Sequence, residues 1–451
     1  MKKLLISLIT AFLCSNAFAT SPTLLEVYGQ ALGSDPIFQQ AIAKRFSDQE
    51  YFPINLAALL PNAAVTLTPA YNKYNYSGAA VANYPNYSTR GYVMNLTVTQ
   101  TIFDFSKVAG VCNARAISKE ADADLNVATQ DLMIRVAKAY FAVLRDEDNL
   151  RYNKVSRKSY AKQLDQVNQQ YKVGLKTITD YYTASASYNH AVAEEIAAEN
   201  QLSNDKENLR VLTGVLYPEL AKLSEKFPLV SPQPVDIDSW VQTATRQNWG
   251  IKAAQYQALA VHEIIKQQYA GHMPTLNLQG SYNVNYSRLA SDAAPGTVQN
   301  LFIPPGPSRI AQSTGMLNLS IPLSTGGAVI AKTHKAQYDY QIAAQKLEQQ
   351  MRETVNQTRQ SYLGVLSGIS MIKADRAAVR SAQSSLDGFR AGYDVGTQTL
   401  VDVLNQQQKV LLAQEQYASD RYNYVINLLS LKQAAGTLSQ NDLAAINTWL
   451  Q

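Results

Sequence analysis

Two long stretches without proline constrain the fold of this 451-residue chain more than any other feature. No proline lies between Pro85 and Pro218, a stretch of 132 residues, and none lies in the 129 residues after Pro322. Proline inside a helix removes a backbone hydrogen bond and clashes with the preceding turn, so its absence permits very long helices. The segment from Ser106 to about Tyr171 would extend roughly 100 Å as a single helix. The chain is therefore predicted to be mainly α-helical, with helices too long for a compact domain.

Apolar residues in these stretches are spaced as in helices that pack along their length. Between residues 351 and 372 they recur in alternating steps of four and three. Further along, others recur at every seventh position: Val403, Val410, Tyr417, Tyr424 and Leu431. This spacing is typical of coiled coils. On its own it would also suit a non-catalytic, elongated periplasmic coiled-coil scaffold.

The sequence also contains an internal duplication. Shifting it by 222 positions aligns residues 159–214 with 381–436 without a gap, and both copies contain the pattern Y-x-V-G-x-x-T-x-x-D. The pattern begins at Tyr171 in the first copy and at Tyr393 in the second. A weaker match at a shift of 213 places Pro61 on Pro274. Such a repeat predicts two similar structural units.

The duplication predicts a domain organisation with two repeats and a linker. Residues 20–217 form the first repeat, in the order helix, two strands at about 61–103, long helix and helix. Residues 218–235 contain four prolines and form a linker. Residues 236–451 form the second repeat in the same order, with two strands at about 273–324.

Two charge-poor segments alternate apolar and polar residues with a period of two. Residues 61–103 contain two charged side chains, and residues 273–326 contain three. In the second segment Leu276, Leu278 and Val284 fall on one side of a strand, while Asn277 and Asn283 fall on the other. This alternation predicts strands with one apolar face and one uncharged polar face.

Four strands in two hairpins cannot close into a barrel, and they would leave two open edges. A sheet lying over a soluble core is the commoner reason for such faces, but helices this long and thin would not cover it. We therefore expect several copies of the chain to contribute four strands each to one membrane barrel, with apolar side chains toward lipid. Two copies would give eight strands and three would give twelve, and only twelve leave a water-filled bore.

The N-terminal segment has the features of a signal peptide. Lys2 and Lys3 precede an apolar run, and the small-residue motif Ala17-Phe18-Ala19 follows, so residues 1–19 are predicted to be removed. Lipid attachment at Cys14 is disfavoured, because bulky residues stand directly before it. No later run approaches the ~20 apolar residues of a spanning helix, so strands must make any membrane crossing.

Sequence patterns for catalysis are missing. The four histidines lack metal-ligand spacing, and the chain has no phosphate-binding loop, dinucleotide fingerprint or nucleophile elbow. Forty lysines and arginines stand against 35 aspartates and glutamates, which does not indicate a nucleic-acid surface. We expect no catalytic residue, no cofactor, no metal and no nucleic-acid partner. An outer-membrane barrel enzyme would need a clustered nucleophile and base, which the sequence does not provide.

Several segments resemble the TolC family of outer-membrane channel proteins over essentially the whole mature chain. They are residues 96–107 (LTVTQTIFDFSK), 171–180 (YKVGLKTITD), 271–278 (GHMPTLNL), 393–396 (YDVG) with 401–403 (VDV), and 421–424 (RYNY). The resemblance implies a homotrimer whose twelve strands form one outer-membrane β-barrel, continuous with a periplasmic tunnel of twelve helices. It implies a location in the outer membrane, extending into the periplasm. The hairpin loops near residues 77–89 and 288–313 would then face outside the cell.

The resemblance also implies a function and partners. The chain would be the exit duct of tripartite efflux systems, type I secretion systems or both, passing small toxic compounds or proteins. It would contact outer-membrane lipid, a periplasmic adaptor (membrane fusion protein) and an inner-membrane pump. The adaptor would bind the two Y-x-V-G turns, at Val173, Gly174, Leu175, Val395, Gly396 and Thr397. The two glycines can also be ordinary helix C-caps.

A gate at the closed tunnel entrance is a further implication of the resemblance. Asp402 matches an acidic ring of better-known members, while Asn405, on the same helix face, replaces a second aspartate. Asp180 occupies the position of Asp402 in the first copy of the repeat. Both aspartates can also be first-turn carboxylates that the helix dipole favours. For Asp180 this interpretation is as good as a role in the gate, whereas for Asp402 the gate role is favoured.

Gln398 departs from the family pattern, which has an arginine there that ties the inner helix pair to the neighbourhood of Thr179 and Asp180. A different bond would then hold the closed state. We expect one from the Tyr393 hydroxyl to the Asp180 carboxylate.

Arg390 is a second departure, because the family pattern has an acidic residue there that would pair with the position of Gln163. An arginine needs an acceptor instead. We expect Arg390 to bond with Asp165 or Asp387.

Overall fold

The computed structural model describes residues 21–78, 87–290 and 306–451. The predicted signal peptide, with Cys14, lies outside the described residues. Most of the two predicted external loops also lies outside them.

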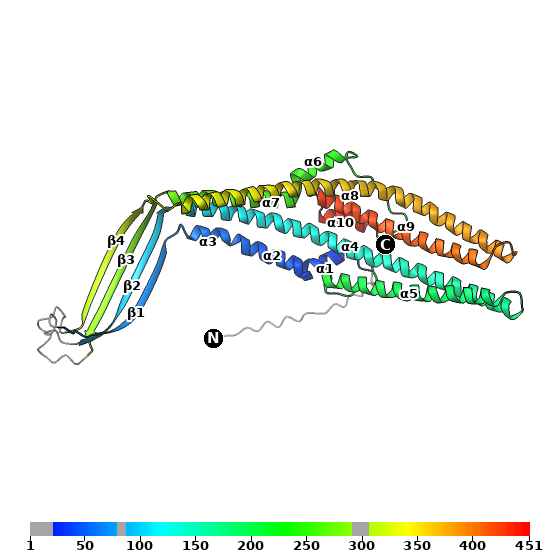
Figure 1. Cartoon of the computed structure of the whole chain (residues 1–451), viewed down its shortest axis with the longest axis horizontal. Helices are drawn as coiled ribbons and strands as arrows, with labels where there is room; N and C mark the ends of the chain where they lie inside the picture. Colours follow the sequence, from blue (N-terminus) through cyan, green and yellow to red (C-terminus); the bar gives the residue numbers. More distant parts are fainter. Residues whose placement is uncertain (1–20, 79–86, 291–305) are drawn as a thin grey trace, which may run out of the picture. The chain divides into compact units, whose positions relative to one another are not determined.

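The described elements are labelled in Figure 1. In chain order they are α1 (Leu24–Ser34), α2 (Pro36–Gln49), α3 (Tyr51–Ala57), β1 (Asn62–Tyr74), β2 (Tyr87–Phe103), α4 (Phe105–Lys172), α5 (Ile178–Thr213), α6 (Ile237–Gln247), α7 (Trp249–Tyr269), the short 3-10 helix η2 (Ala270–His272), β3 (Thr275–Leu289), β4 (Ser308–Ser320), α8 (Ala328–Asp394), α9 (Leu400–Ala434) and α10 (Gln440–Asn447).

The predicted fold class is confirmed: the chain is mainly helical, with four strands and a duplicated order of elements. Helix α4 has 68 residues and α8 has 67, and neither contains a proline. None of the described helices carries an apolar stretch long enough to cross a membrane.

The chain divides into two compact units. We call one the helical unit, formed by residues up to Ile42, by Leu125–Ile251 and by Met351–Gln451. We call the other the strand unit, formed by Ala43–Asp124 and Lys252–Gln350. Each unit takes residues from both copies of the repeat.

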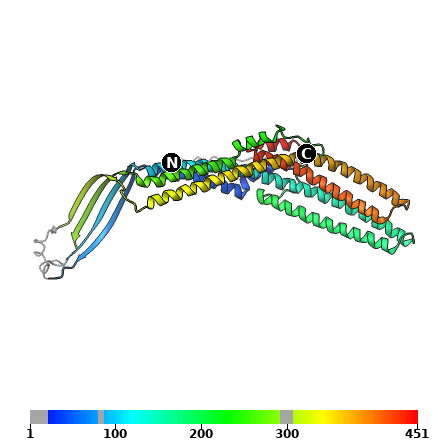
Figure 2. The same ribbon diagram turned by 45° about the horizontal axis from the view of Figure 1, so that its top comes forward.

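The strand unit contains one antiparallel sheet in the order β1-β2-β3-β4, and its strands lie side by side in Figures 1 and 2. The pairing register brings the apolar positions of all four strands onto one face. Leu96 of β2 pairs with Val65 of β1 and with Tyr282 of β3, and Leu278 of β3 pairs with Leu317 of β4. Partners that lie directly opposite each other point to the same side of a sheet, so this face is continuous across the strands.

This apolar face is largely exposed in the isolated chain. Val65 is 67% exposed, Leu317 is 66% exposed and Leu319 is 58% exposed. The opposite face carries asparagine, threonine, serine and glutamine, in such pairs as Asn95 with Asn283. The predicted strand region at about 273–324 extends past the last strand, because β4 ends at Ser320. Within the described chain β1 and β4 each pair on one side only, so the sheet has two open edges.

The core of the helical unit forms where the heptad residues of α9 meet other helices. Val403, Tyr424 and Leu431 are fully buried, and Val410 is almost so. A large apolar cluster surrounds Tyr424 and Leu431, and a second surrounds Val403 and Val410. The seven-residue spacing therefore marks the buried side of α9, as coiled-coil packing requires.

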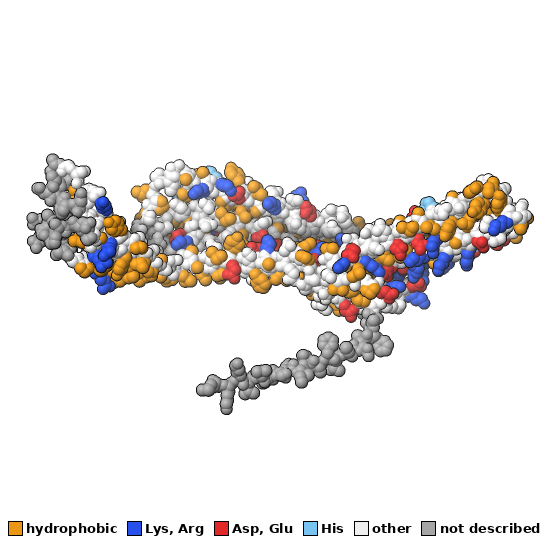
Figure 3. All heavy atoms as spheres, turned by 90° about the horizontal axis from the view of Figure 1, so that it is seen from below, with side chains coloured by type: hydrophobic (Ala, Val, Ile, Leu, Met, Phe, Trp, Pro, Cys, Tyr) orange, Lys and Arg blue, Asp and Glu red, His pale blue; other side chains and the backbone are white. Residues whose placement is uncertain are grey.

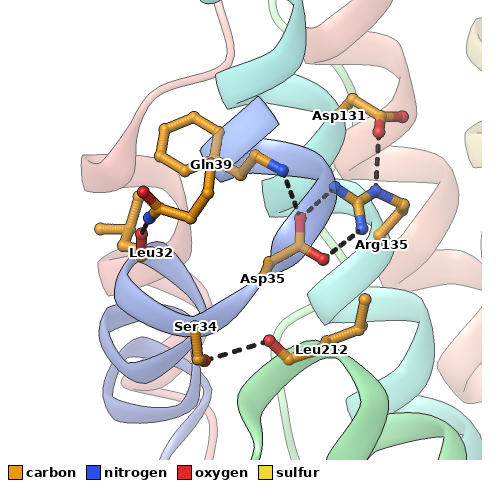
Figure 4. Close-up of polar contacts among 8 residues, drawn as sticks. Leu32, Ser34, Asp35, Gln39, Asp131, Arg135 and Leu212 are labelled. Carbon is orange, nitrogen blue, oxygen red and sulfur yellow. Dashed lines mark hydrogen bonds and ion pairs between the residues drawn. The ribbon is translucent and has the colours of Figure 1, made fainter. Parts of the chain in front are cut away.

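An ion pair joins the first helices to this core, as Figure 4 shows. Arg135 of α4 donates two hydrogen bonds to the Asp35 carboxylate, at 2.7 and 3.1 Å, and a third to Asp131 at 2.7 Å. Burial alone would raise the pKa of Asp35, but the hydrogen bonds and charge of Arg135, together with hydrogen bonds from the backbone N–H groups of Phe38 and Ile37, outweigh it and lower that pKa. The Ser34 hydroxyl also donates to the Leu212 carbonyl of α5.

Candidate functional site

Two turns of almost identical backbone end the long helices of the helical unit. Helix α4 ends at Lys172 and α8 ends at Asp394, and in each case the next helix begins after five residues. Gly174 has φ +77° and Gly396 has φ +81°, a left-handed conformation that other residues adopt only with strain. The Y-x-V-G pattern thus builds a glycine C-cap in both copies of the repeat.

Each turn is followed by a capping box at the start of the next helix. The Thr177 hydroxyl accepts a hydrogen bond from the backbone N–H of Asp180 at 3.2 Å, and the Asp180 carboxylate accepts one from the backbone N–H of Thr177 at 3.1 Å. Thr399 and Asp402 repeat these bonds at the same two distances. The local signal was the T-x-x-D spacing, which is a capping-box pattern. Both aspartates therefore hold a helix start, whatever else they do.

The hydrogen bonds of Asp402 also affect its charge. The Thr399 hydroxyl donates to this carboxylate at 2.5 Å. Together with the backbone N–H of Thr399, it lowers the pKa of Asp402. Asp402 is half-buried and Asn405, one turn further along α9, is exposed. Asp402 is therefore a fixed negative charge at neutral pH.

Tyr393 makes a different contact from the predicted one. Its hydroxyl donates to the side-chain carbonyl of Gln170 at 3.5 Å, not to Asp180, whose carboxylate is taken by its own capping box. Tyr393 is only 5% exposed, and the Lys176 ammonium lies 4.4 Å from its ring centroid. The buried ring therefore joins the second turn to the end of α4 chiefly by packing and a cation–π contact.

The side chain of Gln398 is exposed beside this turn. Within the described residues it forms no hydrogen bond with Thr179 or Asp180. In a single chain, Gln398 therefore does not make the bond to Thr179 or Asp180 that an arginine would make in the family pattern.

Arg390 also bonds to an unexpected partner. It donates to the Ser159 hydroxyl of α4 at 2.6 Å, so the predicted bond to Asp165 or Asp387 is wrong. Asp387 instead accepts a hydrogen bond from Gln383, one turn away on its own helix. An arginine on α8 can reach only the side chains of α4 that face α8, and Ser159 is one of them.

One groove brings several predicted residues together. Its volume is about 490 Å³, and α4 and α8 line it with Gln163, Arg390 and Tyr393 among others. Asn405 lines a separate cavity of about 360 Å³ with residues of α4 and α5. The predicted gate residues thus belong to at least two surfaces of the helical unit.

Apolar side chains are exposed at both turns. Val173 is 70% exposed, Leu175 is 74% exposed and Val395 is 76% exposed, while Gly396 and Thr397 beside them are exposed too. Figure 3 shows hydrophobic side chains gathered at the end of the helical unit where the turns lie. A cluster of exposed apolar side chains at a loop is typical of a surface that binds another protein.

Metal chemistry finds no support in the described part of the chain. It holds no group of three or more histidine, cysteine, aspartate or glutamate side chains placed to bind a metal. Cys112 is a free, exposed thiol.

A family model described as outer membrane efflux protein matches residues 27–215 and 240–437. The two matched ranges fall on the two copies of the repeat. Together they cover most of the chain.

Two relatives are similar over almost the full length of this chain. The outer membrane protein TolC of Escherichia coli (strain K12) is 36% identical, and the match covers 100% of this chain and 90% of that protein. The alkaline protease secretion protein AprF of Pseudomonas aeruginosa is 27% identical, with 99% of this chain and 91% of that protein covered. The crystal structure of the Campylobacter jejuni CmeC outer membrane channel matches with a TM-score of 0.76 at 15% identity, covering 100% of this chain and 98% of that one.

Proposed function

Because the chain belongs to the outer membrane efflux protein family, we propose that three copies of it assemble into one channel through the outer membrane. The chain is an outer-membrane exit duct for efflux and type I secretion, the activities for which its relatives are named. It works together with a pump.

The main support for a trimer is the four-stranded sheet with two open edges. In a barrel of three copies, β4 of one copy pairs with β1 of the next, which removes every open edge. The continuous apolar face meets lipid, and the asparagine, serine and threonine face lines the water-filled bore. Two copies would close only eight strands, whose interior is filled by side chains.

A soluble scaffold accounts poorly for the same sheet. It would leave Val65, Leu317 and Leu319 in water, on a face where polar residues would cost nothing. The long helices fit either function, so the sheet decides between them.

The gate of the proposed channel lies at the start of α9. One Asp402 from each copy would place three carboxylates around the narrow entrance, where they attract cations. The family pattern would supply six, because Asn405 replaces the second aspartate. The bond from Arg390 to Ser159 joins α8 to α4 and supports a closed state held differently from the family pattern.

The exposed apolar turns are the proposed site for the periplasmic adaptor that links channel and pump. Val173 and Leu175 present one apolar surface and Val395 a second, each beside a glycine that allows close backbone approach. Outer-membrane lipid would contact the apolar face of the sheet.

Mass and conductance of the detergent-extracted protein test the proposal together. We expect light scattering to give a detergent-corrected protein mass of three chains, and the same preparation to form cation-selective channels in planar bilayers. A mass near one chain, or recovery from the periplasm without detergent, would contradict a trimeric membrane channel.

A further inference from the structure

Three basic side chains and one carboxylate line the groove between α4 and α8. Lys158 and Lys162 lie one turn apart on the same face of α4, and Arg390 faces them from α8. Asp394 is the one carboxylate among the lining residues. Like charges one turn apart on a helix repel each other. An anion that neutralises them would relieve this repulsion, which favours its binding.

These cations lack the carboxylate partners that the nearby arginines of α4 have. Arg151, two turns earlier on α4, pairs with Asp148 at 2.7 Å. Lys158, Lys162 and Arg390 pair with no carboxylate in the described chain, and the two lysines are exposed. Their charge therefore remains available to a ligand.

The groove also holds a neutral donor without an acceptor. The side-chain amide nitrogen of Gln163 is buried and has no hydrogen-bond partner among the described residues. A buried donor without a partner costs free energy, which a bound acceptor would recover. Gln163 follows Lys162 directly and lines the same groove, so the free donor and the free charges lie together.

We propose that this groove binds a multivalent anion of the phosphate class and that the bound anion bridges α4 and α8. Ammonium and guanidinium groups bind phosphate oxygens through charge-assisted hydrogen bonds, and a multivalent anion can engage cations from both helices at once. With a volume of about 490 Å³, the groove has room for pyrophosphate as well as for a single phosphate group. The bridging role rests on the proposed gate. In the family pattern an acidic residue at position 390 would pair with the position of Gln163, and with arginine at 390 the bound anion would join the two helices instead.

Calorimetric titration of the full detergent-extracted chain with inorganic pyrophosphate tests the binding. We expect saturable binding that weakens as salt concentration rises. The double variant Lys158→Gln, Lys162→Gln should lose at least tenfold in affinity, because two charged contacts are removed at exposed positions. Lys154→Gln is the matched control, since Lys154 is an exposed lysine on the same helix that does not line the groove, and its affinity should change less than twofold.

The source of the phosphate group is resolved by adding phosphatidic acid, a lipid whose phosphomonoester is itself a multivalent anion, in mixed micelles to the same titration. Competition with pyrophosphate would identify a lipid head group as a ligand. If the lipid does not compete, the ligand is a soluble anion. Either result supports a phosphate site. The phosphate site would be overturned if pyrophosphate does not bind. It would also be overturned if the double variant and Lys154→Gln lose affinity equally.

Bilayer recordings separate this inference from the proposed function. Pyrophosphate added on the periplasmic side should lower the conductance of the wild-type channel and leave that of the double variant unchanged. A channel that conducts normally but ignores pyrophosphate would overturn the bridging role while leaving the channel function intact. A preparation without any conductance would instead contradict the channel function.

Discussion

The two helical turns share a backbone but differ in how deeply they are buried. Their glycines have φ values within a few degrees of each other, and both following helices begin with a Thr–Asp capping box. Yet Tyr393 is 5% exposed and its counterpart Tyr171 is 40% exposed. Leu400 at the start of α9 is 3% exposed, whereas Ile178 at the start of α5 is 44% exposed. Duplication has preserved the local structure, and the surrounding helices have given each turn a different environment.

Different contacts hold the two turns in place. The second turn is held by an apolar cluster that includes Leu386, Tyr393, Leu400 and Val403. The first is held mainly by a stack of Tyr171 on Tyr181, with 6.1 Å between ring centroids. The second turn is thus the fixed element and the first the more accessible one.

Replacing Tyr393 and Tyr171 with alanine should give the largest difference between the two turns. Tyr393→Ala removes a buried ring and should lower the free energy of unfolding by about 3 kcal/mol or more, whereas Tyr171→Ala should cost less than about 1 kcal/mol. Denaturant unfolding followed by circular dichroism in detergent measures both. Tyr393→Phe is the control, because it keeps the ring and loses only the long bond to Gln170. Similar losses for the two alanine variants would show that burial does not distinguish the turns.

In the sheet, by contrast, the two repeats should respond alike. Val65 of β1 and Leu278 of β3 are equivalent at a shift of 213 and lie on the same apolar face. Arginine at either position should cost about 2 to 4 kcal/mol if it faces lipid near the membrane midplane. The yield of trimer on native gels measures assembly. Asn283→Arg on the polar face is the control and should assemble normally, so equal yields from all three variants would contradict the assigned faces.

The two capping aspartates should differ in conduction rather than in stability. Asparagine can still accept the capping bonds, so Asp180→Asn and Asp402→Asn should both fold. Only Asp402→Asn should reduce cation selectivity and block by multivalent cations from the periplasmic side, and Asn405→Asp should strengthen both. Single-channel recordings in planar bilayers measure these properties. If Asp180→Asn alters them and Asp402→Asn does not, the constriction belongs to the first turn.

A carboxyl pair in the second repeat gives the smallest predicted effect, and it depends on pH. Burial and the neighbouring Asp420 raise the pKa of Asp375 to about 6. At a shift of 222 the first repeat has Asn153 at this position, which donates to Glu415 at 3.0 Å. Asp375→Asn should therefore give the second repeat the uncharged side chain of the first.

The sign of this effect follows from linkage. Above pH 6 the carboxyl is ionised in both folded and unfolded chains, so the folded state bears the full repulsion. Between pH 6 and 4 the folded chain binds a proton first and the penalty disappears. Asp375→Asn should thus raise stability at pH 8 by less than about 1 kcal/mol and leave it unchanged at pH 4. Unfolding of both proteins at the two pH values tests this, and an equal gain at both would point to packing instead of charge.

Much of the fold was predictable because it depends on residues close together in the sequence. The absence of proline permitted α4 and α8, and the period of two marked the strands that β1 to β4 confirm. Glycine and threonine at fixed spacing specified both turns, since a C-cap and a capping box form within a few residues. The capping role of Asp180 and Asp402 follows from the same local pattern.

The side-chain partners were not predictable in this way. Tyr393 bonds to Gln170 instead of Asp180, and Arg390 bonds to Ser159 instead of Asp165 or Asp387. Both acceptors lie on α4, more than 200 residues before their donors. Charge complementarity favours a carboxylate, but the rotation of α4 against α8 decides which side chain is within reach.

By itself, the sequence determined the lengths of the helices, the alternating faces of the strands, the duplication and the backbone of the two turns. The tertiary structure alone decided that Tyr393 is buried while Tyr171 is exposed, and that Lys158, Lys162 and Arg390 line one groove. The physical reason is the range of the interactions. Backbone hydrogen bonds and steric limits act within one turn, so a repeated motif folds the same way twice, whereas burial and pairing depend on packing between helices whose residues are distant in the sequence.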